Sequence, residues 1–454
     1  MSRLLNYPER LFLLVAIPFG LLFTFLTPPF AGGDESFHYQ RTAEIAYLQF
    51  LDKQSEVPAG IVNFIQFGRA YYLNINQADD FSTEYSTPAD IPLDAEHIGT
   101  LNMNIFTVHH PVMYLPQAIV FRLAAEAGVK PFFLLYISRL AGLAAGIMLA
   151  WFAIRLMPAH RYMLTGFALL PTCVFMRSYL HTDAISNGVA FLFIALSIRA
   201  ITRVEPITVK ETFTLAVSAL LVASCKGAYL PLALLVFAIP RIRFGSLEKK
   251  LKVTCTIFAT AFIGGFGWMY LVKTFLFTDY SYHTNGGTPI PDEQLAFILS
   301  NPFGYLEVII NTLIYTPFFQ TVLQGLIAQM GHGNILLGGW AYVVIFFLFA
   351  CVAVFDVTSM DESYSKPVYV WIITLFLMCF GLALTLLYIQ WTSVQWPIII
   401  GFHGRYLIPI LPLLFLFAKP AKEATQVLAG FSVIALGMIG LSIASWSLLA
   451  VFYP

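Results

Sequence analysis

The chain has little charge and few cysteines. Only 11% of its 454 residues are charged, and 25 basic side chains balance 25 acidic ones, whereas a soluble domain carries about 25% charge. With no net charge, nothing suggests a nucleic-acid partner. All five cysteines lie in apolar segments, so neither a disulfide framework nor a zinc site is expected. The first apolar run lacks a small-residue cleavage site, and we interpret it as a retained span rather than a signal peptide.

Apolar runs dominate the chain instead. Hydrophobic residues make up 58% of it, and runs long enough to cross a bilayer, about 20 residues each, recur along nearly its whole length. Because helices satisfy their own backbone hydrogen bonds in lipid, the sequence predicts an all-α polytopic membrane protein with about eleven transmembrane helices. No repeat is evident, so residues 1–454 read as one domain. The expected spans are residues 11–26, 131–155, 162–176, 184–198, two short helices within 212–240, 251–277, 338–355, 368–388, 406–418 and 427–451.

Basic residues orient these spans. Arg3 and Arg10 precede the first one, which places the N-terminus in the cytoplasm by the positive-inside rule. Residues 28–130 then form a long first extracytoplasmic loop with interfacial helices, one of them over 111–126. Residues 278–335 contain no lysine or arginine and are expected to form a second outer region. The strongest cytoplasmic signal is the basic cluster of Arg241, Arg243, Lys249, Lys250 and Lys252.

This topology gathers the unusual polar residues on the outer side. Ionisable groups in or near spans are costly and by default suggest a functional site, and here they come from separate segments. They are Asp34, Glu35, His38, Arg41, His109, His110, Arg177, His181, Asp183, Lys226, His332, His403 and Arg405.

The segment after the first span has a recognisable geometry. A helix that begins near Asp34 would place Asp34, His38 and Arg41 on one face. Glu35 would lie about 100° round the helix, within reach of a metal or a neighbouring helix. Asp34 could instead merely cap an interfacial helix. The two preceding glycines favour function, because they let backbone approach a ligand closely.

Other members of the set allow two interpretations each. Asp183 is more readily a cap for the following span, whereas Lys226 favours function over a snorkelling side chain. An outer arginine such as Arg405 suits bidentate phosphate binding, but it could also anchor the interface. His109 and His110 are more typical of structural positions than of ligands.

Five short segments, in this order along the chain, resemble the glycosyltransferase C superfamily and, more narrowly, the bacterial membrane family of domain of unknown function 2142. They are PFAGGDESFHYQRTAEIA (29–46), HPVMYLPQ (110–117), SYLHTDAISN (178–187), KGAYLP (226–231) and GRYLIPILP (404–412). The resemblance implies a catalytic acid at Asp34, with Arg405 and Lys226 facing a donor phosphate. One departure is the Ala-Gly-Gly before Asp34, where relatives often carry proline next to the acid.

The resemblance and the polar residues together predict an inverting glycosyltransferase of the bacterial inner membrane. It would move a sugar from a polyprenyl-phosphate donor to a cell-envelope glycan or lipid-linked acceptor at the extracytoplasmic face. Asp34 would act as general base, and Glu35 would orient it or share a divalent cation, Mg²⁺ or Mn²⁺. The expected substrate-binding residues are His38, Arg41, His109, His110, Arg177, Asp183, Lys226, Arg405 and Tyr406.

Two other functions share this compartment. A transporter or flippase of lipid-linked saccharides usually shows inverted repeats, broken helices and charges near the midplane. In this chain no repeat is visible and the ionisable groups lie toward one face, so only the Lys226 segment looks transporter-like. A polymerase that joins polysaccharide units is poorly separated from a glycosyltransferase by sequence.

Overall fold

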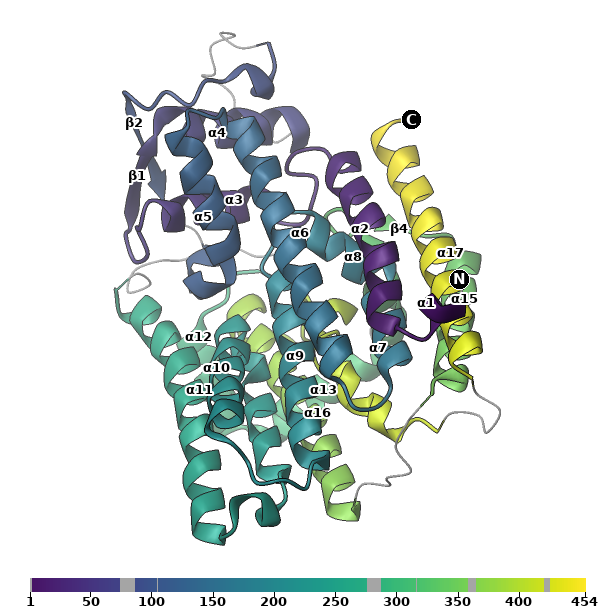
Figure 1. Ribbon diagram of the computed structural model, residues 1–454. Helices are drawn as coiled ribbons and strands as arrows, with labels where there is room; N and C mark the ends of the chain where they lie inside the picture. Colours follow the sequence, from purple (N-terminus) through teal and green to yellow (C-terminus); the bar gives the residue numbers. More distant parts are fainter. Residues whose placement is uncertain are drawn as a thin grey trace.

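The computed structural model describes residues 2–73, 86–103, 105–275, 287–315, 317–357, 365–419 and 425–454. Its regular structure is almost entirely helical (Figure 1). The α-helices are α1 (Ser2–Leu5), α2 (Pro8–Leu26), α3 (Glu35–Ala46), α4 (Ala59–Leu73), α5 (Leu115–Glu126), α6 (Pro131–Leu156), α7 (Arg161–Ala168), α8 (Pro171–Ser178), α9 (Asp183–Thr202), α10 (Val209–Cys225), α11 (Leu247–Phe275), α12 (Pro291–Ser300), α13 (Pro302–Tyr315), α14 (Phe318–Ile327), α15 (Gly339–Phe355), α16 (Lys366–Trp391) and α17 (Gln426–Phe452).

Shorter elements connect these helices. The 3₁₀ segments are η1 (Pro88–Asp90), η2 (Ile105–Val108), η3 (Pro111–Tyr114), η4 (Gly227–Ala238), η5 (Arg241–Phe244), η6 (Gly404–Leu407) and η7 (Leu411–Phe417). Strands β1 (Gln54–Pro58) and β2 (Ile98–Asn102) pair antiparallel with Gln54 opposite Asn102, and β3 (Gln329–Met330) pairs with β4 (Ile335–Leu336).

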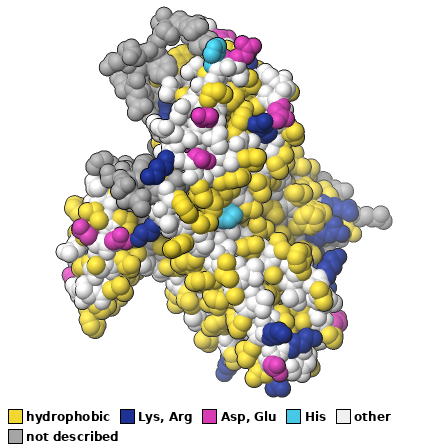
Figure 2. Space-filling model, turned by 90° about the vertical axis from the view of Figure 1, so that its left-hand side faces the viewer, with side chains coloured by type: hydrophobic (Ala, Val, Ile, Leu, Met, Phe, Trp, Pro, Cys, Tyr) yellow, Lys and Arg dark blue, Asp and Glu magenta, His cyan; other side chains and the backbone are white. Residues whose placement is uncertain are grey.

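Six helices of the described residues are long and apolar enough to cross a membrane: α2, α6, α9, α11, α16 and α17. The pair α12–α13 would make a seventh if it is one span, although it bends by 108°. The chain is therefore a multi-pass membrane protein, but the expected eleven spans are not confirmed. Hydrophobic side chains cover most of the face in Figure 2, and Lys and Arg side chains gather at its lower end.

Two expected crossings are broken helices. Residues 162–176 form α7 and α8, separated just before Pro171, where Leu170 is extended (ψ 142°), as the residue before a proline prefers. Residues 212–240 form α10 and η4, which meet at an extended Lys226 (ψ 138°) and pack against each other. The second break agrees with the predicted pair of short helices, and it carries Lys226 between them.

The long loop after α2 forms a small layer at one end of the helices. Helices α3, α4 and α5 lie there beside the β1–β2 ribbon, and α4 and α5 pack against α6 (Figure 1). Residues 111–126 form η3 followed by α5, as the predicted helix there requires, and its interfacial location stays a prediction. Helices α2, α6 and α8 pack together beneath this layer, and this packing places the loop that follows α2 against the loop that follows α8.

Candidate active site

Asp34 lies at the start of α3 in an unusual conformation. Its backbone is left-handed (φ 59°, ψ 14°), and its side chain makes no capping hydrogen bond to α3. Four residues earlier, Phe30 also has a positive φ of 62°. Such conformations are costly for residues other than glycine and persist where the surroundings hold them, often at functional sites. The interpretation of Asp34 as a simple helix cap therefore does not describe its side chain.

Arg139 of α6 holds this segment in place. The arginine is fully buried and donates hydrogen bonds to three carbonyl oxygens at the end of α2 and just beyond it. Those acceptors are the carbonyls of Thr24 at 2.9 Å, Thr27 at 2.7 Å and Pro28 at 2.9 Å. A rigid, permanently charged donor fork suits this task.

The same guanidinium binds Glu35. Its Nε and Nη2 lie 2.7 Å and 2.6 Å from the two carboxylate oxygens of Glu35, which is also fully buried. The backbone N–H of Leu180, in the loop after α8, donates to Glu35 at 2.8 Å. Glu35 thus ties α3 to α6 and to that loop, and this is the geometry of a positioning group.

The contacts of Glu35 do not fit those of a metal ligand, because both of its oxygens already accept charged or backbone donors. Among the residues that the structure describes, no group of three or more His, Cys, Asp or Glu side chains is placed to hold a metal ion. Of the two expected ligands, only Asp34 faces open space. The divalent cation stays a prediction.

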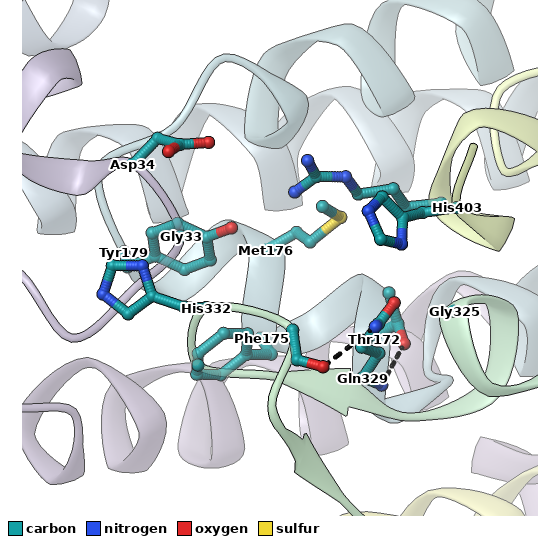
Figure 3. A pocket seen from close by; sticks show the side chains of 13 residues that line it. Gly33, Asp34, Thr172, Phe175, Met176, Tyr179, Gly325, Gln329, His332 and His403 are labelled. Atoms are coloured by element: carbon teal, nitrogen blue, oxygen red, sulfur yellow. Dashed lines mark hydrogen bonds between the residues drawn. The ribbon is translucent and has the colours of Figure 1, made fainter. Parts of the chain in front are cut away.

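A small polar pocket of about 70 Å³ opens beside Asp34. Its walls come from the Asp34 loop, α8, the end of α14, the tip of the β3–β4 hairpin and η6. Figure 3 shows the carboxylate of Asp34 and the hydroxyl of Tyr179 directed into it, with His403 on the opposite side. The lining residues are Gly33, Asp34, Thr172, Phe175, Met176, Tyr179, Gly325, Gln329, Gly331, His332, Gly333, His403 and Arg405.

Of the two glycines before Asp34, Gly32 is required by Tyr179 and Gly33 is not. A Cβ atom at Gly32 would lie 2.2 Å from the ring of Tyr179, so this position must lack a side chain. At Gly33 a Cβ atom would meet only ordinary contacts, with the nearest atom 3.5 Å away. Gly32 therefore accommodates a protein ring, and Gly33 alone leaves bare backbone facing the pocket.

Arg405 faces Asp34 from η6. Its Nη1 lies 3.9 Å from the Cβ position of Gly33, and it interacts electrostatically with Asp34, Tyr179 and Asp183. Within the described part of the chain, no hydrogen bond or ion pair joins Arg405 to another side chain. η6 packs closely on α14: a Cβ atom at Gly404 would lie 1.9 Å from the carbonyl oxygen of Val322. The Gly-Arg sequence thus brings a guanidinium without an acidic partner to the pocket.

Lys226 lies nearby but is already paired. Its ammonium is 2.7 Å from the carboxylate of Asp183, and its side chain is 19% exposed. The same nitrogen lies 4.9 Å from the centre of the Tyr406 ring, and the Arg405 guanidinium lies 5.5 Å from that ring. Lys226 is therefore no snorkelling side chain. The prediction that Asp183 is a helix cap was wrong, because Thr182 occupies the cap position and Asp183 pairs with Lys226.

Three histidines cluster next to this pair, of which His38 and His181 are buried and His109 is half-buried. The ring of His38 lies 4.3 Å from that of His181 and 5.8 Å from that of His109, and its Nδ1 is 2.7 Å from the hydroxyl of Tyr114. Burial lowers the pKa of His109 and that of His181 to about 3 each, and it holds the pKa of His38 well below 6.5. All three rings are therefore neutral at physiological pH.

The geometry can be compared with known proteins. Residues 17–414 match the family model described as "Predicted membrane protein (DUF2142)". The chain belongs to this family. The narrower resemblance predicted from five sequence segments is thus confirmed, whereas the wider relation to glycosyltransferase C enzymes stays a prediction. No curated protein and no solved structure matched the chain.

Three of the predicted binding residues of this DUF2142 protein that do not line the pocket are Arg41, His110 and Arg177. Arg41 pairs with Glu44 at 2.9 Å and with the Phe50 carbonyl oxygen at 2.9 Å, so it holds α3 to its own loop. His110 accepts a hydrogen bond from the N–H of Val112 at 3.2 Å, in the manner of a cap for η3.

Arg177 is the third. It turns from the pocket-lining face of α8 and donates to the carbonyl oxygen of Ala168 at 2.8 Å. That carbonyl lies at the end of α7, where the break before Pro171 removes helical partners. One nitrogen of Arg177 therefore satisfies the broken helix. Asp34, His38 and Arg41, which were expected to share one face, likewise have different surroundings. Asp34 faces the pocket, His38 lies in the histidine cluster, and Arg41 pairs with Glu44.

Several lining residues of this DUF2142 protein had no assigned role. Thr172 belongs to an apolar stretch and carries no signal beyond its residue type, whereas Tyr179 lies in the family-like segment SYLHTDAISN but had no role assigned to it. His332 sits at the tip of the β3–β4 hairpin, where Gly331 and Gly333 both have positive φ, and its Nε2 is 3.1 Å from the carbonyl oxygen of Phe30. The Gly-His-Gly sequence was the one available signal for that turn.

Proposed function

We propose that this protein is an inverting membrane glycosyltransferase. It moves a sugar from a polyprenyl-phosphate donor to a cell-envelope glycan or lipid-linked acceptor at the extracytoplasmic face of the bacterial inner membrane. The single observation that carries the proposal is the pair of Asp34 and Arg405, a carboxylate and a guanidinium that face one polar pocket without bonding each other. The sequence resemblance to glycosyltransferase C enzymes supports the same reaction.

The negative charge of Asp34 suits the attacking acceptor hydroxyl, and the positive charge of Arg405 suits the leaving phosphate. The acceptor hydroxyl gives its proton to the Asp34 carboxylate as its oxygen bonds to the anomeric carbon. The bond from that carbon to the phosphate oxygen breaks, and polyprenyl phosphate leaves with the electron pair. A base is needed on the attacking side, and a cation is needed where the leaving phosphate gains charge. Arg405 is the cation with free donors, whereas Lys226 keeps Asp183 as its partner.

A divalent cation, if this protein uses one, would find only Asp34 as a free carboxylate in the pocket. It would supply further charge stabilisation for the leaving phosphate. Asp34 must in either case be held in position, and Glu35 and Arg139 do this by fixing the loop on which it lies.

The test uses membranes that contain the protein and polyprenyl-phosphate donors carrying radiolabelled sugars. We expect a glycosidic product from wild type and a loss of about 10²–10⁴-fold in rate for Asp34→Asn. Asp292→Asn is the matched control, because Asp292 is an exposed aspartate in a surface ion pair with Lys273. Full activity of Asp34→Asn would remove Asp34 from the mechanism. Label that crosses the membrane without forming a glycosidic bond would favour a transporter.

A further inference from the structure

The bare backbone of Gly33 faces three hydrogen-bonding groups. The position that a Cβ atom would occupy lies 3.5 Å from the carbonyl oxygen of Gly331, 3.8 Å from the hydroxyl of Tyr179 and 3.9 Å from Nη1 of Arg405. These groups come from three separate elements: the β3–β4 hairpin, the loop after α8, and η6. Two of them donate hydrogen bonds and one accepts, and all three border the pocket.

Tyr179 is fixed in place yet has an unused hydroxyl. Its ring packs against Gly32 and its side chain is buried, while its hydroxyl points into the pocket (Figure 3). No other group in the described ranges hydrogen-bonds that hydroxyl. Burial raises the pKa of Tyr179 well above its usual value, so the hydroxyl keeps its proton and can donate it. A donor held this way beside an unpartnered guanidinium indicates a missing ligand atom.

A hydroxyl group matches this set better than a phosphate oxygen does. A phosphate oxygen could accept from Tyr179 and Arg405 but would face the lone pairs of the Gly331 carbonyl. A hydroxyl oxygen accepts from both donors and gives its own proton to the carbonyl. The remaining N–H groups of Arg405 stay available for the phosphate, since a guanidinium has five donors.

We infer that Gly331, Tyr179 and Arg405 form a subsite for one hydroxyl of the transferred sugar, the hydroxyl on the carbon next to the anomeric centre. This inference rests on the proposed function. Under the proposed function the Arg405 guanidinium also binds the phosphate, and the ring hydroxyl nearest to that phosphate is the one on the adjacent carbon. Hydrogen bonds to that hydroxyl strengthen in the transition state of glycosyl transfer. The subsite therefore selects sugars with a free 2-hydroxyl and rejects 2-deoxy and 2-acetamido sugars.

The experiment measures binding to the purified full chain in detergent by ligand-induced thermal stabilisation. The probes are farnesyl phosphate, its glucose and mannose phosphodiesters, and the 2-deoxy sugar that these two epimers share. We expect at least one epimer to bind about 10- to 100-fold more tightly than the 2-deoxy form, as for hydrogen bonds to a charged group. Tyr179→Phe should remove most of this preference and leave the affinity for the 2-deoxy form unchanged.

Gly33→Ala is the second variant. The added methyl group fits without a clash but fills the space in front of the three groups, so it should also abolish the preference while the protein stays folded. Tyr39→Phe and Gly381→Ala are the controls: Tyr39 bonds the carbonyl oxygen of Pro131, and Gly381 has no neighbour within 4 Å of its Cβ position. Both controls should keep the preference for the 2-hydroxyl.

Different results separate the two proposals. Binding of farnesyl phosphate with equal affinity for the sugar and its 2-deoxy form overturns the hydroxyl subsite and leaves the proposed function standing. A Tyr179→Phe variant that weakens every probe equally also overturns it, because the residue would then act on the fold alone. Failure of wild type to bind any of the prenyl phosphates overturns the proposed function and the subsite with it.

Discussion

Glu35 and Arg139 form a fully buried ion pair with two hydrogen bonds, of 2.7 Å and 2.6 Å. Glu35 is adjacent in sequence to Asp34, whose strained backbone the pair holds in place. The two acids of the Asp-Glu sequence thus have different roles: the Asp34 carboxylate faces the pocket, and the Glu35 carboxylate fixes the loop. Two neighbouring acids that look alike in sequence have opposite surroundings.

Glu35→Gln should destabilise the protein. Removing one partner of a buried pair leaves the other charge uncompensated, at a cost of about 3–5 kcal/mol. Asp34→Asn, which removes no hydrogen bond to the helix, should leave the melting temperature close to that of wild type. Thermal unfolding of both variants in detergent measures the difference. A Glu35→Gln protein as stable as wild type but inactive would instead place Glu35 in the chemistry or on a metal.

Asp183 and Lys226 should show strong energetic coupling. Their charged groups are 2.7 Å apart, and the carboxylate side chain is only 4% exposed. Asp183→Asn and Lys226→Met should each destabilise the fold, and the double variant should lose less than the sum of the two. A coupling energy of about 0.5–3 kcal/mol is typical of residues in one network. Strictly additive losses in a thermal-unfolding cycle would mean that the two residues act independently.

The histidine cluster should make stability fall in acid. The unfolded chain takes up these protons near pH 6.5, but the folded protein takes them up at His109 and His181 only near a pKa of about 3. Between these values the unfolded state binds more protons, so stability rises with pH through this window and is lost as the pH falls below about 6.5.

Melting temperatures measured from about pH 7.5 to about pH 4.5 test this dependence. His181→Asn should flatten it, because an asparagine oxygen can still accept the N–H of Asp183 without titrating. His97→Asn is the control, since the His97 side chain is 77% exposed. An unchanged slope in His181→Asn would show that other groups cause the loss.

Some features of the fold and of the candidate site can be predicted from the sequence, because they depend on residues that are close together in the chain or on the side of the membrane where a segment lies. The break at Lys226 is predictable, since a lysine and a glycine interrupt an apolar run between two basic ends. The approach of Asp34 and Arg405 follows from placing their segments on one side of the membrane. The number of spans does not follow, because a hydropathy pattern treats α7 and α8 as one run, whereas Pro171 divides them.

The misplaced residues have physical causes that only the fold reveals. Arg177 looks like an outer cation, but the break between α7 and α8 leaves the carbonyl oxygen of Ala168 without a helical partner, and Arg177 donates to it. Asp183 looks like a cap, but Lys226 reaches it from a segment far along the chain. Tyr179 is one aromatic residue in a chain that is 16% aromatic, so its residue type gives no signal. Its position depends on Gly32, which leaves room for its ring.

The orientation of the chain is the last prediction. If Arg241 to Lys252 face the cytoplasm and the β1–β2 layer faces outward, single cysteines on the two sides should react differently with a membrane-impermeant maleimide. Lys249 and Asp90 suit this test, because Lys249 is exposed at the start of α11 and Asp90 is exposed in η1, beside the β1–β2 layer. The background must be free of the five native cysteines, one of which, Cys255, is exposed. In intact cells a cysteine at position 90 should be labelled at once, and one at position 249 only after the membrane is permeabilised. The reverse pattern would place the Asp34 pocket on the cytoplasmic side, where the proposed acceptors of the cell envelope could not reach it.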